Sequence, residues 1–211
     1  MTSLPVIIIG VNSFALEVAN IFQKNNVVIY GFLEDDPKKK DAFIGEIPVL
    51  GSTEDEQYWS LIGKNCNVFV ALENPIERKK MIETIIEDCK TKPVNAIHPE
   101  ASIADVHSIG YGIFLGNNAI IQPSCRIGDH CVIGAGVIVE TGVILEEFVQ
   151  IGSGSVIGKE AKIENNAFVG INATIVGSIK IGKSASIGAG SVVIENLPNS
   201  KRVFGNPAKI V

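Results

Sequence analysis

Three histidines, His98, His107 and His130, are the residues of this chain whose side chains titrate nearest to neutral pH. Each could take a proton from a reacting hydroxyl or amine and so act as a general base. Their positions in the chain show no spacing typical of a metal site. The histidines therefore direct the search toward proton transfer, and the sequence predicts no metal centre.

A second candidate site lies at Gly10-Val11-Asn12-Ser13, where an apolar stretch gives way to a helical pattern. Backbone N–H groups and the positive end of a helix dipole make such a turn suitable for an anion. Gly10, Asn12 and Ser13 are thus candidates to contact a phosphate or a sugar. A full dinucleotide fingerprint is absent, because Asn12 and Ser13 stand where glycines are expected. The alternative is a plain turn in which Ser13 caps the helix.

A third candidate is the acidic pair Asp35 and Asp36, in the stretch Phe32-Leu33-Glu34-Asp35-Asp36. Carboxylates accept hydrogen bonds from the N–H groups of a base and attract an ammonium group. A solvated turn before Pro37 is the alternative.

The first half, residues 1–94, alternates apolar runs with helical patterns, which indicates a small Rossmann-like parallel sheet covered by helices. The predicted strands are Pro5–Gly10, Val27–Asp35, Pro48–Gly51 and Asn67–Leu72, and the predicted helices are Ser13–Lys24, Glu54–Ile62 and Pro75–Cys89.

The second half, residues 95–211, has a different period. Seventeen aliphatic residues follow one another at a spacing of six, with no insertion. They are Ile97, Ile103, Ile109, Leu115, Ile121, Ile127, Ile133, Val139, Leu145, Ile151, Ile157, Ile163, Val169, Ile175, Ile181, Ile187 and Val193. Neither an α-helix nor an ordinary strand has this period, which is that of a parallel β-helix built from hexapeptides.

Each hexapeptide is expected to supply one short strand and one corner, and three of them close a coil. Residues eighteen apart would then stack at about 4.8 Å. A second inward residue, mostly small or apolar, follows four positions after each aliphatic one; this series includes Ala161 and also His107. Glycine often follows the aliphatic residue directly, as at Gly152. We expect glycine or asparagine to form the tight corners. The tail from Asn196 to Val211 is expected to leave the β-helix and cap its end.

Composition limits the possible functions. The chain has 46% hydrophobic residues, 19% charged residues and a net charge of -5, so it should be globular, and nucleic acid is not an expected partner. No apolar run reaches the roughly 20 residues of a membrane span. The start does not read as a signal peptide, and the four cysteines form no CxxC pair. These features favour a cytoplasmic protein without a membrane partner.

The repeat and the C-terminal stretch Gly205-Asn206-Pro207-Ala208-Lys209 resemble the hexapeptide-repeat acyltransferases, whose β-helix is left-handed. With an α/β half placed first, the chain is similar to the sialic-acid O-acetyltransferase-like branch. That branch includes the N-acetyltransferases of bacterial nucleotide-linked 4-amino sugars. The resemblance implies an enzyme of surface-glycan (lipopolysaccharide) biosynthesis that uses acetyl-CoA. It also implies a homotrimer with active sites between neighbouring β-helices and a nucleotide-sugar on the N-terminal half.

The resemblance further implies which residues bind acetyl-CoA. The pantetheine arm would lie along the later coils, and phosphates would meet the tail. The implied residues are Gln150, Gly152, Ser153, Gly170, Ile171, Gly188, Ala189, Pro207 and Lys209.

The histidine expected as the family's base is missing. The motif of a hydrophobic residue, any residue, histidine and an acid best matches Val139-Glu140-Thr141-Gly142, where Thr141 replaces the histidine. The family's junction motif identifies His98 as structural, and the repeat places His107 inward. This leaves His130 and Glu140 as weak alternatives.

Without a base, we expect an acceptor that needs none, such as an amine that is partly neutral at working pH. The backbone N–H groups of Gly142, Gly152 and Ser153 are candidates to stabilise the oxyanion. Acetylation of a sugar hydroxyl is the alternative reaction, and a catalytically silent scaffold that binds nucleotide-sugars is the alternative of another class.

Overall fold

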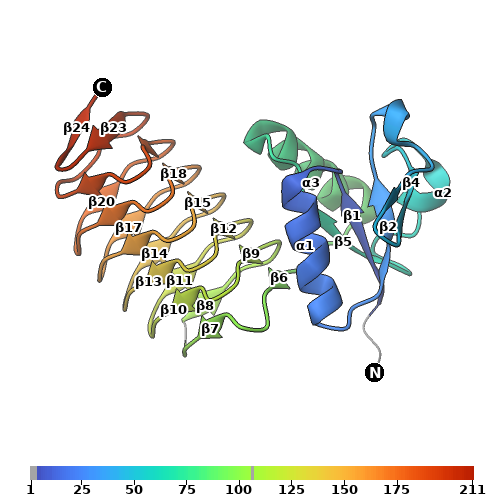
Figure 1. The fold of residues 1–211 in the computed structure, drawn as a ribbon, viewed down its shortest axis with the longest axis horizontal. Coiled ribbons are helices and arrows are strands. Elements are labelled where there is room, and N and C mark those ends of the chain that lie inside the picture. The colour runs from blue at the N-terminus through green and yellow to red at the C-terminus, as the bar shows by residue number, and fades with distance from the viewer. Residues whose placement is uncertain (1–3, 106) are drawn as a thin grey trace. The chain divides into compact units, whose positions relative to one another are not determined.

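The computed structural model describes residues 4–105 and 107–211, which form two compact units (Figure 1). The first unit runs to Ala96 and the second runs from Ile97 to Val211.

The first unit is a five-stranded sheet with helices. Its elements are β1 (Val6–Ile9), α1 (Ser13–Lys24), β2 (Ile29–Leu33), the 3-10 helix η1 (Pro37–Lys39), β3 (Phe43–Ile44), β4 (Ile47–Gly51), α2 (Glu56–Trp59), β5 (Asn67–Val70) and α3 (Pro75–Cys89). The strand order is β3-β4-β2-β1-β5, and every pair is parallel except β3 with β4. The predicted parallel sheet is therefore confirmed.

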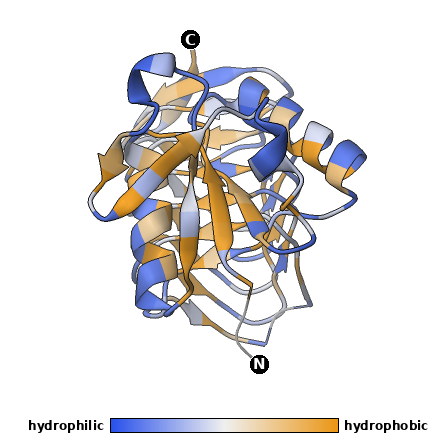
Figure 2. Cartoon of the chain, turned by 90° about the vertical axis from the view of Figure 1, so that its right-hand side faces the viewer, coloured by the Kyte–Doolittle hydropathy of each residue, from blue (hydrophilic) through white to orange (hydrophobic). Residues whose placement is uncertain are grey.

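The centre of this sheet is held by apolar packing. All four residues of β1 are buried, as expected for a strand with neighbours on both sides. Phe14 and Phe22 of α1 both contact Phe69 of β5 edge-to-face, with ring centroids 6.3 and 6.1 Å apart. Figure 2 shows the hydrophobic colouring that runs along the strands of the sheet.

Two local predictions for this unit were wrong. The predicted helix Glu54–Ile62 is only the single turn α2, because the chain after it closes a turn in which Cys66 N donates to Leu61 O at 3.0 Å. The sequence also missed β3, which forms a hairpin with β4 around Gly45, a residue with a φ of 63°.

The second unit is a left-handed β-helix, and its seventeen short strands confirm the predicted register. Each strand has two residues, and the second is the predicted aliphatic one. The strands are β6 (Ala96–Ile97), β7 (Ser102–Ile103), β8 (Ser108–Ile109), β9 (Phe114–Leu115), β10 (Ile120–Ile121), β11 (Arg126–Ile127), β12 (Val132–Ile133), β13 (Ile138–Val139), β14 (Ile144–Leu145), β15 (Gln150–Ile151), β16 (Val156–Ile157), β17 (Lys162–Ile163), β18 (Phe168–Val169), β19 (Thr174–Ile175), β20 (Lys180–Ile181), β21 (Ser186–Ile187) and β22 (Val192–Val193).

The strands stack into three parallel sheets, one for each side of the column. Residues eighteen apart pair, as Val139 does with Ile157 and Ile157 with Ile175. The sheet orders are β22-β19-β16-β13-β10-β7, β20-β17-β14-β11-β8 and β21-β18-β15-β12-β9-β6, and the tail adds two further strands beside β21. From Leu115 onward the inward aliphatic residues are buried, and each contributes about 1.5–3 kcal/mol relative to an exposed position.

The corners differ from the expectation in one respect. Left-handed backbone occurs at the third residue after the aliphatic one, as at Gly142 (φ 75°) and Asn172 (φ 53°), and not at the glycine directly after it. That glycine has another role. A Cβ on Gly152 would lie 2.6 Å from Ile171 N of the next coil, so glycine is required there by close stacking.

The two ends of the column also differ from prediction. At the first coil, Ile103 and Ile109 are each 37% exposed, and His107, predicted to point inward, is exposed as well, because β7 and β8 are the last strands of their sheets. At the other end, the tail does not leave the β-helix at once. It adds β23 (Arg202–Gly205) beside β21, and β24 (Ala208–Ile210) then folds back antiparallel to β23.

Candidate functional site

The first candidate site lies at the carboxyl ends of β1, β2 and β5, which are neighbours in the sheet. The segments that follow them are residues 10–12, 34–36 and 71–73. The chain places β2 on one side of β1 and β5 on the other, so the strand order reverses here. Ligands of open parallel sheets bind at such a switch point.

Asn12, and not Ser13, caps α1, which corrects the predicted cap. The Asn12 backbone is extended, and its Oδ1 accepts a hydrogen bond from Ala15 N at 2.9 Å. Its Nδ2 donates to Ala71 O at 2.8 Å and so ties the turn to the end of β5. Gly10 is required by the same contact, since its φ is 105° and a Cβ would lie 3.1 Å from Ala71 O.

Ser13 binds a residue that the sequence did not single out. The Ser13 hydroxyl donates to Glu73 Oε1 at 2.6 Å, and both side chains are exposed. The two residues are sixty positions apart, so nothing local in the sequence indicated the pair. They present a hydroxyl and a carboxylate together at the switch point.

Glu34 is a further residue that the sequence missed, although it lies inside the acidic stretch. Its carboxylate accepts from Val11 N at 2.9 Å, from Asp36 N at 3.1 Å and from Lys39 Nζ at 3.2 Å. Lys39 Nζ also donates to Val11 O at 2.8 Å. Glu34 therefore fills the anion-binding side of the turn after β1 with a carboxylate of the protein itself.

The predicted acidic pair takes two different local roles. Asp35 Oδ1 accepts from Thr53 N at 2.8 Å and from Thr53 Oγ1 at 2.9 Å. Asp36 caps η1 by accepting from Lys38 N at 3.0 Å. Asp35 is the more exposed of the two, so it is the one that keeps a carboxylate face toward solvent.

The second candidate site is on the β-helix, and three surfaces of the column describe it. The apolar face is the sheet of β7, β10, β13, β16, β19 and β22, whose outward residues are Ser102, Ile120, Ile138, Val156, Thr174 and Val192. The charged face is the sheet of β8, β11, β14, β17 and β20, whose outward residues are Ser108, Arg126, Ile144, Lys162 and Lys180. The third face is the sheet of β6 to β24.

Of the nine predicted thioester residues, Gln150 lies in β15, and Pro207 and Lys209 lie in the hairpin of β23 and β24, but the other six lie on one edge of the column. We call this edge the glycine edge. It consists of the corners through which the chain passes from a strand of the third face to the next strand of the apolar face. Gly152, Gly170 and Gly188 stack there eighteen residues apart, and so do Ser153, Ile171 and Ala189. In the first series each glycine approaches the next coil so closely that any side chain would meet backbone or, at Gly188, the Phe204 ring. Of the second series, Ile171 is 56% exposed.

Thr141 and Glu140 lie on another edge, the threonine edge, whose corners follow the apolar face. Thr141 Oγ1 donates to Gln122 Oε1 on the preceding coil at 3.1 Å. Glu140 Oε2 accepts from Lys159 N on the following coil at 2.9 Å. The apolar face separates these two residues from the glycine edge within one chain.

One histidine, the exposed His107, lies on the threonine edge, in its first corner after β7 and two coils before Thr141. His98 is buried, and its Nδ1 accepts from Glu100 N at 3.1 Å. His130 is 5% exposed and packs between the rings of Tyr111 and Phe148, with centroids 5.2 and 4.8 Å away. Burial, together with the hydrogen bond to Asp129, raises the pKa of Tyr111 in this cluster. The cluster occupies the corner that follows the charged face.

Two of the three expected oxyanion donors are already used by the coils. Gly142 N donates to Pro123 O at 3.1 Å, and Gly152 N donates to Val169 O at 2.7 Å. Among the described residues, Ser153 N donates to no protein acceptor. Only Ser153 therefore remains available for that role.

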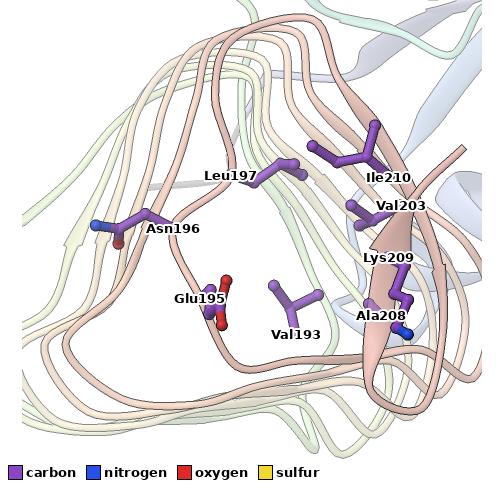
Figure 3. Close-up of a pocket in the computed structure, with 8 residues that line it drawn as sticks. All are labelled: Val193, Glu195, Asn196, Leu197, Val203, Ala208, Lys209 and Ile210. Carbon is purple, nitrogen blue, oxygen red and sulfur yellow. The ribbon is translucent and has the colours of Figure 1, made fainter.

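Of two cavities that the described residues line, one includes a predicted site residue. A cavity of about 300 Å³ opens at the C-terminal end of the column, where Val193, Leu197 and Val203 point into it (Figure 3). Lys209 is the one predicted residue that lines it. A second cavity, of about 430 Å³, lies beside Val28 and Glu46 and includes none of them.

No helix among the described residues combines the length and hydropathy needed to cross a membrane. Within the same ranges, no group of three or more histidine, cysteine, aspartate or glutamate side chains is placed to hold a metal ion.

Two family models match the chain, one for each unit. The PglD N-terminal domain matches residues 5–85. The bacterial transferase hexapeptide, a model of six repeats, matches residues 107–141 and 160–195. No curated protein matches the chain.

Solved structures match both units together. A histidine-to-asparagine mutant of perosamine N-acetyltransferase from Caulobacter crescentus, in complex with CoA and GDP-perosamine, is 28% identical over 99% of each chain, with a TM-score of 0.89. The acetyltransferase domain of PglB from Neisseria gonorrhoeae is 23% identical, and WeeI from Acinetobacter baumannii is 24% identical. Both have a TM-score of 0.87, cover 99% of this chain and are matched over 100% of their own length.

Proposed function

We propose that this chain acetylates the 4-amino group of a nucleotide-linked 4-amino-4,6-dideoxy sugar. The chain is an acetyltransferase that joins a PglD N-terminal domain to transferase hexapeptide repeats. Acetyl-CoA is the donor, and the product enters bacterial surface-glycan synthesis. The observation that carries this proposal is the likeness, over 99% of both chains, to an enzyme crystallised with CoA and GDP-perosamine.

The glycine edge suits the thioester. CoA carries a long, narrow pantetheine arm with amide groups, and the glycine edge offers it a row of exposed corner residues, Ser153, Ile171 and Ala189, spaced one coil apart. We assign Gln150, Gly152, Ser153, Gly170, Ile171, Gly188 and Ala189 to this arm, with Pro207 and Lys209 toward the phosphates. The Ser153 N–H would meet the oxyanion of the tetrahedral intermediate.

The site is completed by a second copy of the chain. Within one chain, the threonine edge and the glycine edge border opposite sides of the apolar face. If three copies pack their apolar faces around a threefold axis, the threonine edge of each copy meets the glycine edge of the next. The charged face supports this choice, because Lys162 and Lys180 form ion pairs there with Glu146 and Glu164, each at 2.8 Å, in solvent. The assembly is therefore a homotrimer with three sites.

The nucleotide-sugar binds at the carboxyl ends of β1, β2 and β5. Gly10, Asn12 and Ser13 form the turn that it contacts, and Asp35 and Asp36 lie at the end of β2. Since Glu34 already occupies Val11 N, this turn favours hydrogen-bond donors such as ribose hydroxyls or base N–H groups over a phosphate.

The reaction proceeds without a protein base. The neutral amine attacks the thioester carbonyl carbon, and the C–S bond then breaks with departure of the CoA thiolate. The proton lost by nitrogen passes to water. A hydroxyl has a pKa far above neutrality and needs a base for the same attack, so the replacement of histidine by Thr141 favours N-acetylation.

The test uses the purified full-length protein with acetyl-CoA and a panel of nucleotide-linked sugars with 4-amino, 3-amino or only hydroxyl groups. Release of the CoA thiol and a mass gain of one acetyl group are measured. We expect turnover of the 4-amino sugars. Turnover of hydroxyl acceptors alone would refute N-acetylation. Failure to bind acetyl-CoA by calorimetry would favour a silent scaffold.

A further inference from the structure

The threonine edge contains a polar pair that the fold does not require. Thr141 Oγ1 donates to Gln122 Oε1 at 3.1 Å, and both side chains are half-buried. The two coils are already joined by their backbones, since Gln122 N donates to Val139 O at 2.9 Å and Gly142 N donates to Pro123 O at 3.1 Å. The side-chain pair therefore adds little to the stacking and is available for another role.

The pair fixes the direction in which the threonine hydroxyl can act. A hydroxyl has one proton to donate and two lone pairs that accept. The proton of Thr141 is spent on Gln122, so toward an incoming group Thr141 can only accept. An acceptor at this position cannot stabilise an oxyanion, but it can hold an N–H.

We propose that Gln122 and Thr141 form a clamp that receives the sugar's amine in its neutral form, an inference that rests on the proposed function. Thr141 is the catalytic residue of the clamp, because its oxygen accepts one amine N–H and thereby directs the nitrogen lone pair toward the thioester carbonyl. Gln122 is a positioning residue that acts by holding the Thr141 proton. Neither residue takes a proton during the reaction, and water receives the one that nitrogen loses.

The surrounding charges are consistent with a clamp that does not titrate. The charged or titratable residues of the threonine edge are Asp105, His107, Cys125, Glu140, Lys159, Glu160 and Glu195. His107 and Glu195 lie in the first and last corners, two and three coils away from Thr141, and burial raises the pKa of the Cys125 thiol. Glu140 Oε2 is bound to Lys159 N, and Glu160 N donates to Thr141 O at 3.0 Å, so the following coil holds both corner residues in place. The pH dependence of kcat/KM should then report the substrate amine alone.

The first experiment measures kcat/KM of the full-length protein against pH with two amino sugars whose amine pKa values differ. Those pKa values are measured separately by NMR titration of each sugar. We expect one inflection for each sugar, at its own amine pKa. A second ionisation that is common to both sugars and lies below pH 8 would mean that a protein group accepts the proton, and it would overturn the clamp.

The second experiment compares variants. Thr141→Val keeps the shape but removes the acceptor, and we expect a loss of about tenfold in kcat/KM, the worth of one hydrogen bond. Thr141→Ser should recover most of this loss. Gln122→Leu should lose a similar factor, and the double variant should lose no more than either single one, because the two residues act as a unit. Ser178→Ala, which removes another hydroxyl from the same edge, is the matched control and should retain activity.

The outcomes separate this inference from the proposed function. Wild-type activity in Thr141→Val, or additive losses in the double variant, would overturn the clamp while leaving N-acetylation intact. Thermal unfolding of each variant identifies any loss that comes from misfolding. If no amino sugar is acetylated by the wild-type protein, the proposed function fails, and the clamp fails with it.

Discussion

If the proposed trimer forms its sites between copies, two inactive variants should restore each other. Thr141→Trp fills the threonine edge, and Ala189→Trp fills the glycine edge from an exposed corner, so each variant alone should be inactive. In a mixed trimer, a site works only when its threonine edge comes from the Ala189→Trp chain and its glycine edge from the Thr141→Trp chain. With random assembly of equal amounts, that combination has a probability of about one quarter, so about 25% of wild-type activity should return.

The assay requires dissociation and reassembly of the mixture, with trimer mass checked by light scattering before turnover is measured. A matched mixture of wild-type chain and the double variant Thr141→Trp/Ala189→Trp should also show about 25% activity, since both edges of a working site must then be wild type. If each chain held a complete site, the first mixture would stay inactive and the second would retain about half. That pair of results would refute the assembly.

Two further predictions concern the column itself. Gly158→Ala should lower the free energy of unfolding by about 2–4 kcal/mol, because its Cβ would lie 2.5 Å from Gly177 N. Gly136→Ala should lower it by only about 1–2 kcal/mol, because the space around Gly136 is open and only its φ of 66° is unfavourable for alanine. Denaturant titration measures both values. The hydrogen bond from Lys180 lowers the pKa of Glu164 in the folded protein. The stability that this ion pair contributes is therefore present above the ordinary glutamate pKa, and it is lost as the pH falls through the lowered pKa of Glu164. Thermal unfolding measured from pH 6 down to pH 2.5 should therefore show a smaller acid loss in Glu164→Gln, and an equal loss would contradict the pairing.

The register of the β-helix could be predicted because it depends on one inward aliphatic residue in every six. A shift by a single residue would turn Ile163 outward and put Lys162 or Glu164 into the core. No helical or alternating pattern can satisfy seventeen such positions. The sequence therefore predicted every strand from β6 to β22, but not the corner geometry, which depends on how closely Gly152 approaches the next coil, nor the strands of the tail.

The N-terminal turn could not be predicted in the same detail, because its contacts join residues that are far apart in the chain. Ser13 and Asn12 are both good caps by residue type. The choice of Asn12 depends on its second hydrogen bond, to Ala71 O, and Ser13 is drawn instead to Glu73. Likewise, nothing local distinguishes Glu34 from its acidic neighbours until the turn after β1 is placed beside it.

This contrast separates what the column fixes from what it leaves open. The inward position holds mostly aliphatic residues, and the first corner position is often glycine because the next coil is stacked so closely on it. The second corner position holds a wider range of residues, including Thr141, Ser153 and Ile171, although at Gly177 a Cβ would lie 2.9 Å from Lys159 O. The side chain of Thr141 binds Gln122 and takes no part in the backbone ladder. We therefore propose that the acceptor preference of this chain depends on the residues at this second corner position.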